Sequence, residues 1–269
     1  FFLSIIIFSV YSCQKEATHS EDLKDNSEKV TLLNNNFKNF MLKKYTATKS
    51  INSSNRDSIS CFQNVVGCTF DGSFTDTIDM IGYGTCQAVV MWSQYFCYSD
   101  PNLYSIVFSD FTAYPLHGAC DSVETSWHNL FNTHQLDQLE ADIIDFNKVA
   151  QQILQNDISI EFAEDNMTFF QCGGNNLVLN AHFYFSSCFN TCVKFVNKNG
   201  YPSVRYIMSP CGQACCRSTT YYCYNTTTQM VQISPTTSQQ IGSCSELASS
   251  NSCPIGYFDI SRDCDKSCN

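Results

Sequence analysis

Seventeen cysteines constrain this chain of 269 residues more than any other feature of its sequence. In a reducing cytosol so many thiols would be expected only if they held metal, whereas in an oxidising compartment they pair as disulfides. Sixteen of them lie after position 60, and only Cys13 precedes it. We therefore expect a protein that leaves the reducing interior of the cell and is braced by disulfides.

The sequence does not specify how these sixteen cysteines pair. They are Cys61, Cys68, Cys86, Cys97, Cys120, Cys172, Cys188, Cys192, Cys211, Cys215, Cys216, Cys223, Cys244, Cys253, Cys264 and Cys268. The short spacings between 188 and 223 also suit zinc, but export favours disulfides. Neighbours on a strand point to opposite faces, so Cys215 and Cys216 should bond to different partners.

Composition and charge exclude several classes of function. Apolar residues make up 43% of the chain, enough for a folded core. The formal net charge of −10 argues against nucleic acid as a partner and against electrostatic docking on anionic lipids. The sequence contains neither a P-loop nor a dinucleotide-binding glycine pattern, and we expect no cofactor and no metal.

The first ten residues, FFLSIIIFSV, carry no charge and are followed by a polar segment. This run is typical of the apolar part of a signal peptide and is too short to cross a bilayer as a helix. We expect the natural chain to start a few residues earlier. Val10-Tyr11-Ser12-Cys13 resembles a lipobox, in which the cysteine is lipidated and becomes the mature N-terminus. The alternative is an ordinary signal peptide followed by a disulfide cysteine.

After Cys13, the residues Gln14-Lys15-Glu16 resemble the start of Bacteroidota-type lipoproteins. That resemblance implies an outer-membrane location, on either the cell surface or the periplasmic face. The O-glycosylation motif of the same group spans three residues. It begins with Asp, continues with Ser or Thr, and ends with an apolar residue or Thr. Matches at 57–59, 76–78 and 121–123 make Ser58, Thr77 and Ser122 candidate acceptors, although turns and helix caps use the same residues.

The pattern along the chain predicts an α+β fold, mainly antiparallel sheet with one long amphipathic helix. Strands are expected at 74–81, 86–98, 105–111 and 177–185. Hairpins are expected around Asn199-Gly200 and in 215–233. In 121–156 apolar residues recur at helical spacing, with Ser122 or Thr133 as a cap for one helix or two. The stripe consists of Leu136, Leu139, Ile143, Phe146, Ala150 and Ile153.

Four segments follow from these patterns. Residues 1–12 are expected to be the signal peptide, and residues 13–58 a lipidated tether. Apolar positions in the tether predict a short amphipathic helix that docks on the body or on a partner; they are Val30, Leu33, Phe37, Phe40 and Met41. Residues 59–234 are expected to form the main domain, and 235–269 a cysteine-rich extension whose bridges substitute for a core.

Histidines are the first candidates for chemistry. His128, His134 and Asp137 lie close in sequence but lack the four-residue histidine spacing of helical zinc hydrolases. His182 falls on the more polar face of a predicted strand, with Tyr184 two residues further on. We interpret these histidines as structural or surface residues.

Carboxylates and tyrosines are the other candidates. Glu161, Glu164 and Asp165 could act as an acid–base pair on a sugar, but a solvated acidic turn between strands is favoured. Tyrosines on the two predicted hairpins could stack on sugar rings or simply pack. They are Tyr201, Tyr206, Tyr221, Tyr222 and Tyr224. The sequence therefore identifies no catalytic residue.

The long helix followed by hairpins carrying CGQACCRSTTYYC is similar to uncharacterised secreted proteins of Bacteroidota. This resemblance implies no activity. We expect a membrane-anchored, non-catalytic component that binds a glycan or a protein, or serves in an outer-membrane assembly. The alternative is a surface or periplasmic hydrolase that uses an acidic pair or a histidine.

Overall fold

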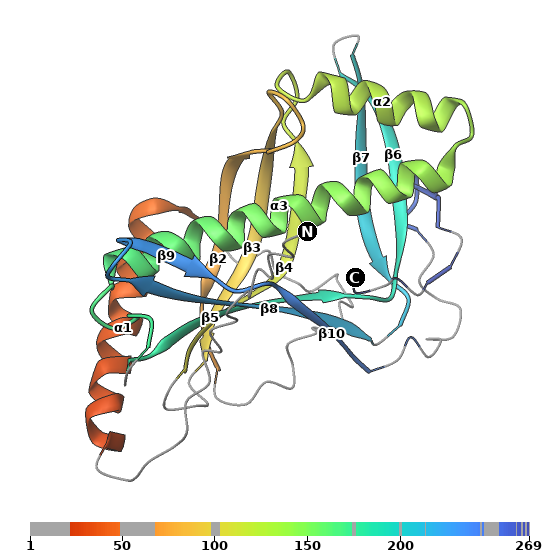
Figure 1. The fold of residues 1–269 in the computed structure, drawn as a ribbon. Coiled ribbons are helices and arrows are strands. Elements are labelled where there is room, and N and C mark those ends of the chain that lie inside the picture. The colour runs from red at the N-terminus through yellow and green to blue at the C-terminus, as the bar shows by residue number, and fades with distance from the viewer. Residues whose placement is uncertain are drawn as a thin grey trace, which may run out of the picture.

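Three helices and eleven strands form the described part of the chain (Figure 1). The structure is a computed structural model that describes residues 22–48, 68–97, 103–173, 176–198, 201–212, 214–242, 244, 253–261, 263, 264, 266 and 268. The helices are α1 (Asp22–Lys44), α2 (Asp121–Asn132) and α3 (Leu136–Asp165). The strands are β1 (Thr46–Thr48), β2 (Cys68–Asp79), β3 (Gln87–Cys97), β4 (Leu103–Pro115), β5 (Val178–Ser186), β6 (Phe189–Lys198), β7 (Tyr201–Pro210), β8 (Cys215–Asn225), β9 (Met230–Ile233), β10 (Thr237–Ile241) and β11 (Phe258–Asp259).

The strands form one large and one small sheet. The large sheet has the order β1-β2-β3-β4-β5-β8-β10, and β9 also pairs with β8. All of these pairs are antiparallel except β4 with β5. The small sheet has the order β11-β6-β7. The mainly antiparallel, disulfide-rich α+β fold is thus confirmed. The expectation of one long helix is not, because the described residues include three helices.

The parallel pairing of β4 with β5 determines where α2 and α3 lie. Parallel neighbours need a long crossover between them, usually helical, and α2 and α3 provide it. Helix α3 has 30 residues, which corresponds to a length of about 45 Å. It crosses one face of the large sheet (Figure 1), and we call this the inner face.

The buried stripe of α3 differs from the predicted one after Ala150. The helix buries Leu154, Ile158 and Phe162, whereas Ile153 remains partly exposed. A stripe that repeats every 3.5 residues drifts around a straight helix by about 20° per heptad. Over this length, the residues that face the sheet after Ala150 are therefore spaced by four, at Leu154 and Ile158.

The region 121–156 contains two helices, and neither of them begins at a residue predicted as a cap, Ser122 or Thr133. Cys120 precedes α2 and Gln135 precedes α3, and neither makes a side-chain capping bond. Thr133 instead ends α2, where its Oγ1 donates to the carbonyl of Asn129 at 2.9 Å. His134 has a positive φ of 58°, which turns the chain away from the helix axis.

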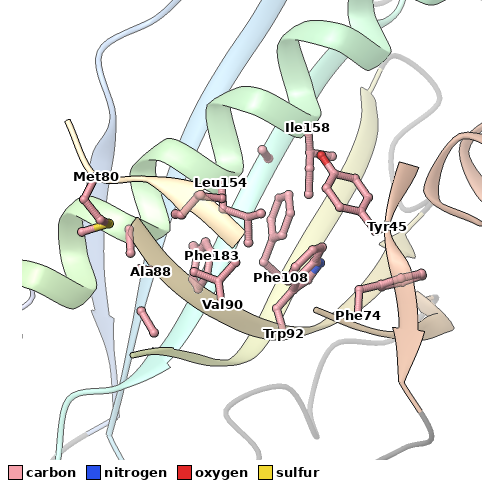
Figure 2. Close-up of a cluster of buried hydrophobic side chains, with 14 of the residues drawn as sticks. Tyr45, Phe74, Met80, Ala88, Val90, Trp92, Phe108, Leu154, Ile158 and Phe183 are labelled. Atoms are coloured by element: carbon pink, nitrogen blue, oxygen red, sulfur yellow. The ribbon is translucent and has the colours of Figure 1, made fainter. Parts of the chain in front are cut away.

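The core lies between α3 and the inner face of the large sheet. Figure 2 shows Trp92, Phe108 and Phe183 of the sheet gathered beneath Leu154 and Ile158 of α3. The rings of Phe108 and Phe183, on the parallel pair of strands, stack with centroids 5.4 Å apart. Each buried aromatic side chain of this kind stabilises the fold by about 1.5–3 kcal/mol relative to an exposed one.

The predicted strands and hairpins are present. The register Lys198↔Tyr201 leaves two residues between β6 and β7, as the Asn-Gly pair predicts. Between β8 and β9 the last pair is Asn225↔Met230. There the Asn225 carboxamide oxygen accepts hydrogen bonds from two backbone amides of the connecting turn.

Helix α1 belongs to the segment expected to be a tether, and it packs on the body. Its apolar residues Val30, Leu33, Phe37 and Met41 are buried, and Phe40 is half-buried. The ring of Phe37 meets that of Phe162 edge-on, with centroids 4.8 Å apart. No helix in the described residues has the length and apolarity needed to cross a membrane.

We predict that Leu154→Ala lowers the free energy of unfolding by about 2–5 kcal/mol, because it leaves a cavity under α3. Ile153→Ala is the matched control, with a similar volume removed from a partly exposed neighbour, and its cost should be clearly smaller. Urea unfolding of the oxidised protein, followed by tryptophan fluorescence, measures both. A larger cost for Ile153→Ala would support the stripe predicted from the sequence.

Candidate functional site

Seven disulfides lie within the described residues. They are Cys68–Cys97, Cys86–Cys120, Cys172–Cys223, Cys188–Cys244, Cys192–Cys253, Cys211–Cys264 and Cys216–Cys268. Cys215 is also disulfide-bonded and does not pair with Cys216. The short-spaced cysteines that suited zinc are therefore oxidised. Cys13 and Cys61 lie outside the described residues.

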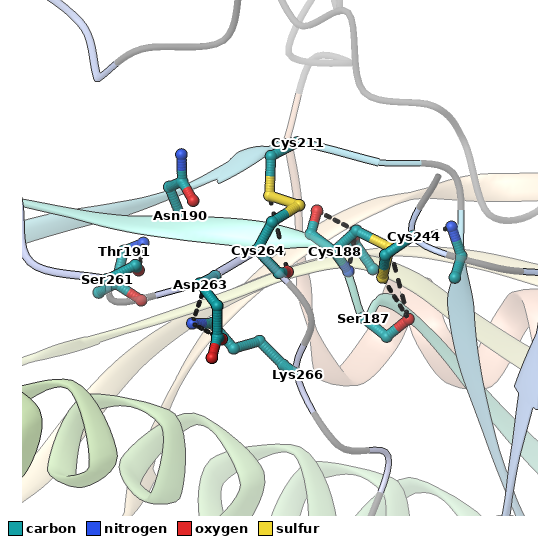
Figure 3. The surroundings of a disulfide bond; sticks show 12 residues. Ser187, Cys188, Asn190, Thr191, Cys211, Cys244, Ser261, Asp263, Cys264 and Lys266 are labelled. Atoms are coloured by element: carbon teal, nitrogen blue, oxygen red, sulfur yellow. Dashed lines mark hydrogen bonds and ion pairs between the residues drawn. A yellow bond between two sulfur atoms is a disulfide. The ribbon is translucent and has the colours of Figure 1, made fainter. Parts of the chain in front are cut away.

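Four of these bridges attach the C-terminal tail to the segment 188–216. Figure 3 shows two of them, Cys188–Cys244 and Cys211–Cys264. Polar contacts reinforce them around the buried Glu140 of α3. Its Oε1 lies 3.0 Å from Lys266 Nζ and accepts hydrogen bonds from Thr191 and Ser261. The backbone amide of Lys266 also donates to the carbonyl of Ser187. The tail is thus held by covalent bonds and one shielded ion pair.

The histidines singled out in the sequence occupy structural positions. His128 bonds Asn132 on α2 and contacts the ring of Phe195. His134 lies in the exposed loop between α2 and α3, and Asp137 is exposed in the first turn of α3. His182 lies on the outer face of the large sheet, 2.9 Å from Thr219 Oγ1. Burial, with a contribution from nearby Arg217, lowers the pKa of His182 to about 4.

Glu161, Glu164 and Asp165 lie in the last turns of α3. The expectation that they form a turn between strands is therefore wrong. Lys44 of α1 forms an ion pair with Glu161 and lies 3.6 Å from Asp157. Glu164 and Asp165 are exposed. Because Lys44 neutralises Glu161 and ties α1 to α3, this group acts as a joint between helices.

Packing explains most of the tyrosine cluster. Tyr206 is buried, and its hydroxyl donates to the carbonyl of Ala113. Tyr222 is buried, and its hydroxyl donates to Asn156 Oδ1 at 2.7 Å. Tyr224 is half-buried, and the side chain of Tyr201 lies outside the described residues. Tyr221 is the described member with an exposed ring, so a sugar-stacking platform of several tyrosines is not assembled here.

Two of the three glycosylation candidates lie within the described residues, and both are exposed. Thr77 is exposed on β2, and Ser122 is exposed in the first turn of α2. Ser58 lies outside the described residues. Both described candidates are accessible to a modifying enzyme.

The most distinctive surface is the edge of the large sheet formed by β9 and β10, which we call the uncharged edge (residues 230–241). Both strands pair with β8 on one side, and all five residues of β10 are exposed. Apolar Met230, Ile233 and Ile241 are also exposed along it. Residues 218–245 contain no Asp, Glu, Lys, Arg or His. Figure 1 shows β9 and β10 following one another along β8.

β9 and β10 carry no charged side chain of their own to oppose strand addition, and the guanidinium of Arg217 on β8 donates to Gln239 of β10. Exposed edge strands are normally protected by charges, prolines or a covering element. Pro235 lies between β9 and β10 and in neither of them. Within the described residues, no strand pairs with the outer side of β10. The long uncharged run could have indicated this surface from the sequence alone.

A second site, which the sequence analysis missed, joins three side chains near the start of α2. His117 Nδ1 lies 3.1 Å from Glu124 Oε2 and 3.8 Å from Asp121 Oδ1. Ser203 Oγ of β7 donates to the other Glu124 oxygen at 2.6 Å. Glu124 is 3% exposed. His117 is followed by Asp121 four residues later and by Glu124 three residues after that, and this spacing was a usable signal because residues so spaced share one side of a helical turn.

Comparison with known proteins gives no relative for this chain. It matches no protein-family model, and no curated protein or solved structure matches it. The functional argument therefore depends on the geometry of the chain itself.

We predict that stability falls as the pH drops from 6.5 toward 4, because the unfolded chain then binds a proton at His182 that the folded chain excludes. This contribution is complete above about pH 6.5 and is on the order of 3 kcal/mol. In His182→Asn, the unfolding free energy between pH 7.5 and 4 should decline less than in the natural protein. Urea unfolding across this range measures the difference, and parallel curves would contradict the prediction.

Proposed function

We propose that this protein is an exported, lipid-anchored, non-catalytic component that binds a partner protein through the uncharged edge. The proposal places it at the outer membrane of a Bacteroidota-type cell, on the surface or the periplasmic face, with Thr77 and Ser122 as exposed glycosylation sites. The partner supplies an extended strand that pairs with β10. The observation that carries the binding proposal is the exposed, uncharged edge.

Export is supported by the disulfides and anchoring by the sequence around Cys13. Seven described disulfides suit an oxidising compartment, where such bonds form and persist. Val10-Tyr11-Ser12-Cys13 resembles a lipobox and overlaps the end of an apolar run. Each acyl methylene buried in the membrane contributes about 0.8 kcal/mol, so several chains hold a protein firmly.

Strand addition is supported by what the edge offers to a ligand. Backbone amides and carbonyls along β10 provide affinity, and exposed side chains on both faces of the strand provide specificity. A glycan would use a platform of aromatic rings, and Tyr221 is the member of the tyrosine cluster whose ring is exposed. An uncharged edge on a chain of net charge −10 also avoids repelling an acidic partner.

The hydrolase alternative has weaker support. Glu161 is paired with Lys44, and burial keeps His182 neutral and bonded to Thr219. The carboxylate of Glu161 is therefore neutralised by a lysine, and the imidazole of His182 is buried in the sheet. A binding component is the better interpretation of these positions.

We predict that a photo-cross-linker at Gln240 captures one partner protein in membranes of the natural host. The same cross-linker at Gln152, exposed on α3, is the matched control and should not capture it. Adding Ser238→Lys should lower the yield by about tenfold, because a charge on the edge opposes strand addition. Ser126→Lys, on the exposed side of α2, should leave the yield unchanged.

Two outcomes would contradict strand addition by a partner. One is equal capture from Gln152 and Gln240, or a yield that Ser238→Lys does not change. The other is capture of a second copy of this chain alone, which would make the edge a self-association surface.

We predict that Cys13→Ala releases the protein from the membrane fraction, because the acyl chains have no other attachment point in the proposed motif. Fractionation and labelling with an alkyne fatty acid measure this directly. Cys68→Ala, which breaks one bridge, is the control and should retain the label. Retention of Cys13→Ala in membranes would exclude lipid anchoring.

A further inference from the structure

We infer that His117, Asp121 and Glu124 form a binding site for one Zn²⁺ ion, with the fourth ligand position open to solvent. One ligand atom from each residue lies within 4.8 Å of the others. The site is separate from the uncharged edge and independent of the proposed partner binding.

The distances fit a small tetrahedral ion. With metal–ligand bonds of about 2.0–2.1 Å, two tetrahedral ligand atoms lie about 3.3–3.4 Å apart. His117 Nδ1 lies 3.1 Å from Glu124 Oε2 and 3.8 Å from Asp121 Oδ1, which brackets this value. The ligand atoms of Asp121 and Glu124 lie within 4.8 Å of each other, so binding would draw the exposed Asp121 side chain toward the other two ligands.

The backbone that carries these ligands is braced. Cys120, between His117 and Asp121, is fully buried and bonded to Cys86. The amide of Leu116 donates to the carbonyl of Gln87 at 2.7 Å, which fixes the start of the turn. Gly118, with a φ of +90°, allows the sharp bend between strand and helix.

The carboxylates are oriented as metal ligands usually are. Ser203 Oγ holds the second oxygen of Glu124, and the Gly118 amide donates to Asp121 Oδ1 at 2.9 Å. Such outer contacts fix ligand orientation and commonly alter metal affinity by about 10- to 100-fold. The Asp121 and His117 side chains are 52% and 33% exposed, which leaves a path for an ion and a water ligand.

Charge favours a cation at this point. Glu124 is a nearly fully buried carboxylate held by Ser203 and His117, and a buried charge is costly without a counter-charge. At 3.1 Å, the lone pairs of His117 Nδ1 and Glu124 Oε2 need a proton or a metal ion between them. A divalent ion would neutralise both carboxylates.

One imidazole nitrogen and two carboxylate oxygens favour zinc over magnesium or calcium. An imidazole nitrogen suits zinc and other transition metals, whereas all-oxygen sites suit magnesium and calcium. Cys120, the nearest cysteine in sequence, is oxidised to a disulfide with Cys86 and does not compete for the ion. Zinc with one nitrogen and two carboxylate oxygens leaves one position for water.

The test is calorimetric titration of the full-length oxidised protein with ZnCl₂, after chelator treatment. We expect one equivalent to bind. His117→Ala and Asp121→Asn should each weaken binding by at least about tenfold, and Ser203→Ala by about tenfold through Glu124. His128→Ala, on the same helix but outside the cluster, is the matched control and should bind as the natural protein does.

Circular dichroism and the unfolding temperature confirm that each variant is folded; Glu124 is left intact because it is buried. Absence of binding by the natural protein would overturn the inference. So would binding that His117→Ala leaves unchanged, or binding that His128→Ala abolishes to the same extent. X-ray absorption of the loaded protein provides a second readout, with one nitrogen and oxygen ligands expected and no sulfur.

Discussion

The packing of α3 against the inner face of the large sheet is the contact on which the other elements depend. It closes the crossover between β4 and β5 and buries the stacked rings of Phe108 and Phe183 beneath the helix. Helix α1 is then positioned by Phe162 and Glu161, both on α3. At the other end of the helix, Glu140 holds Lys266 of the tail. One helix therefore links the core, the N-terminal segment and the C-terminus.

Disulfides stabilise the C-terminal part, which buries too little apolar surface to form a core of its own. β10 is exposed along its length and β11 has two exposed residues, so neither contributes a large buried surface. Four bridges and the Glu140–Lys266 pair hold this region instead. A covalent constraint stabilises mainly by restricting the unfolded chain, so it does not require the strands of this region to be buried.

The sequence predicted local structure better than assembly. Alternating and helical patterns located most strands, both hairpins and α3. An element buried on one face repeats apolar residues at the period of its own structure, so this signal is local. They did not predict the parallel β4–β5 pair or the move of the stripe to Leu154, since both depend on contacts between distant elements. For the same reason the His117–Glu124 cluster was missed: its geometry requires the turn that Cys86–Cys120 fixes. Pairing of the cysteines is likewise a property of the assembled sheets.

The connectivity of the tail has a consequence for biosynthesis. Cys188, Cys192, Cys211 and Cys216 all bond to cysteines 52–61 residues further along the chain. A chain that emerges from its N-terminus exposes these four thiols to each other and to oxidants before their native partners arrive. Correct maturation then requires either delayed oxidation or reshuffling of early mispaired bonds. We therefore expect thiol-exchange capacity to limit the yield of correctly paired protein in a heterologous host.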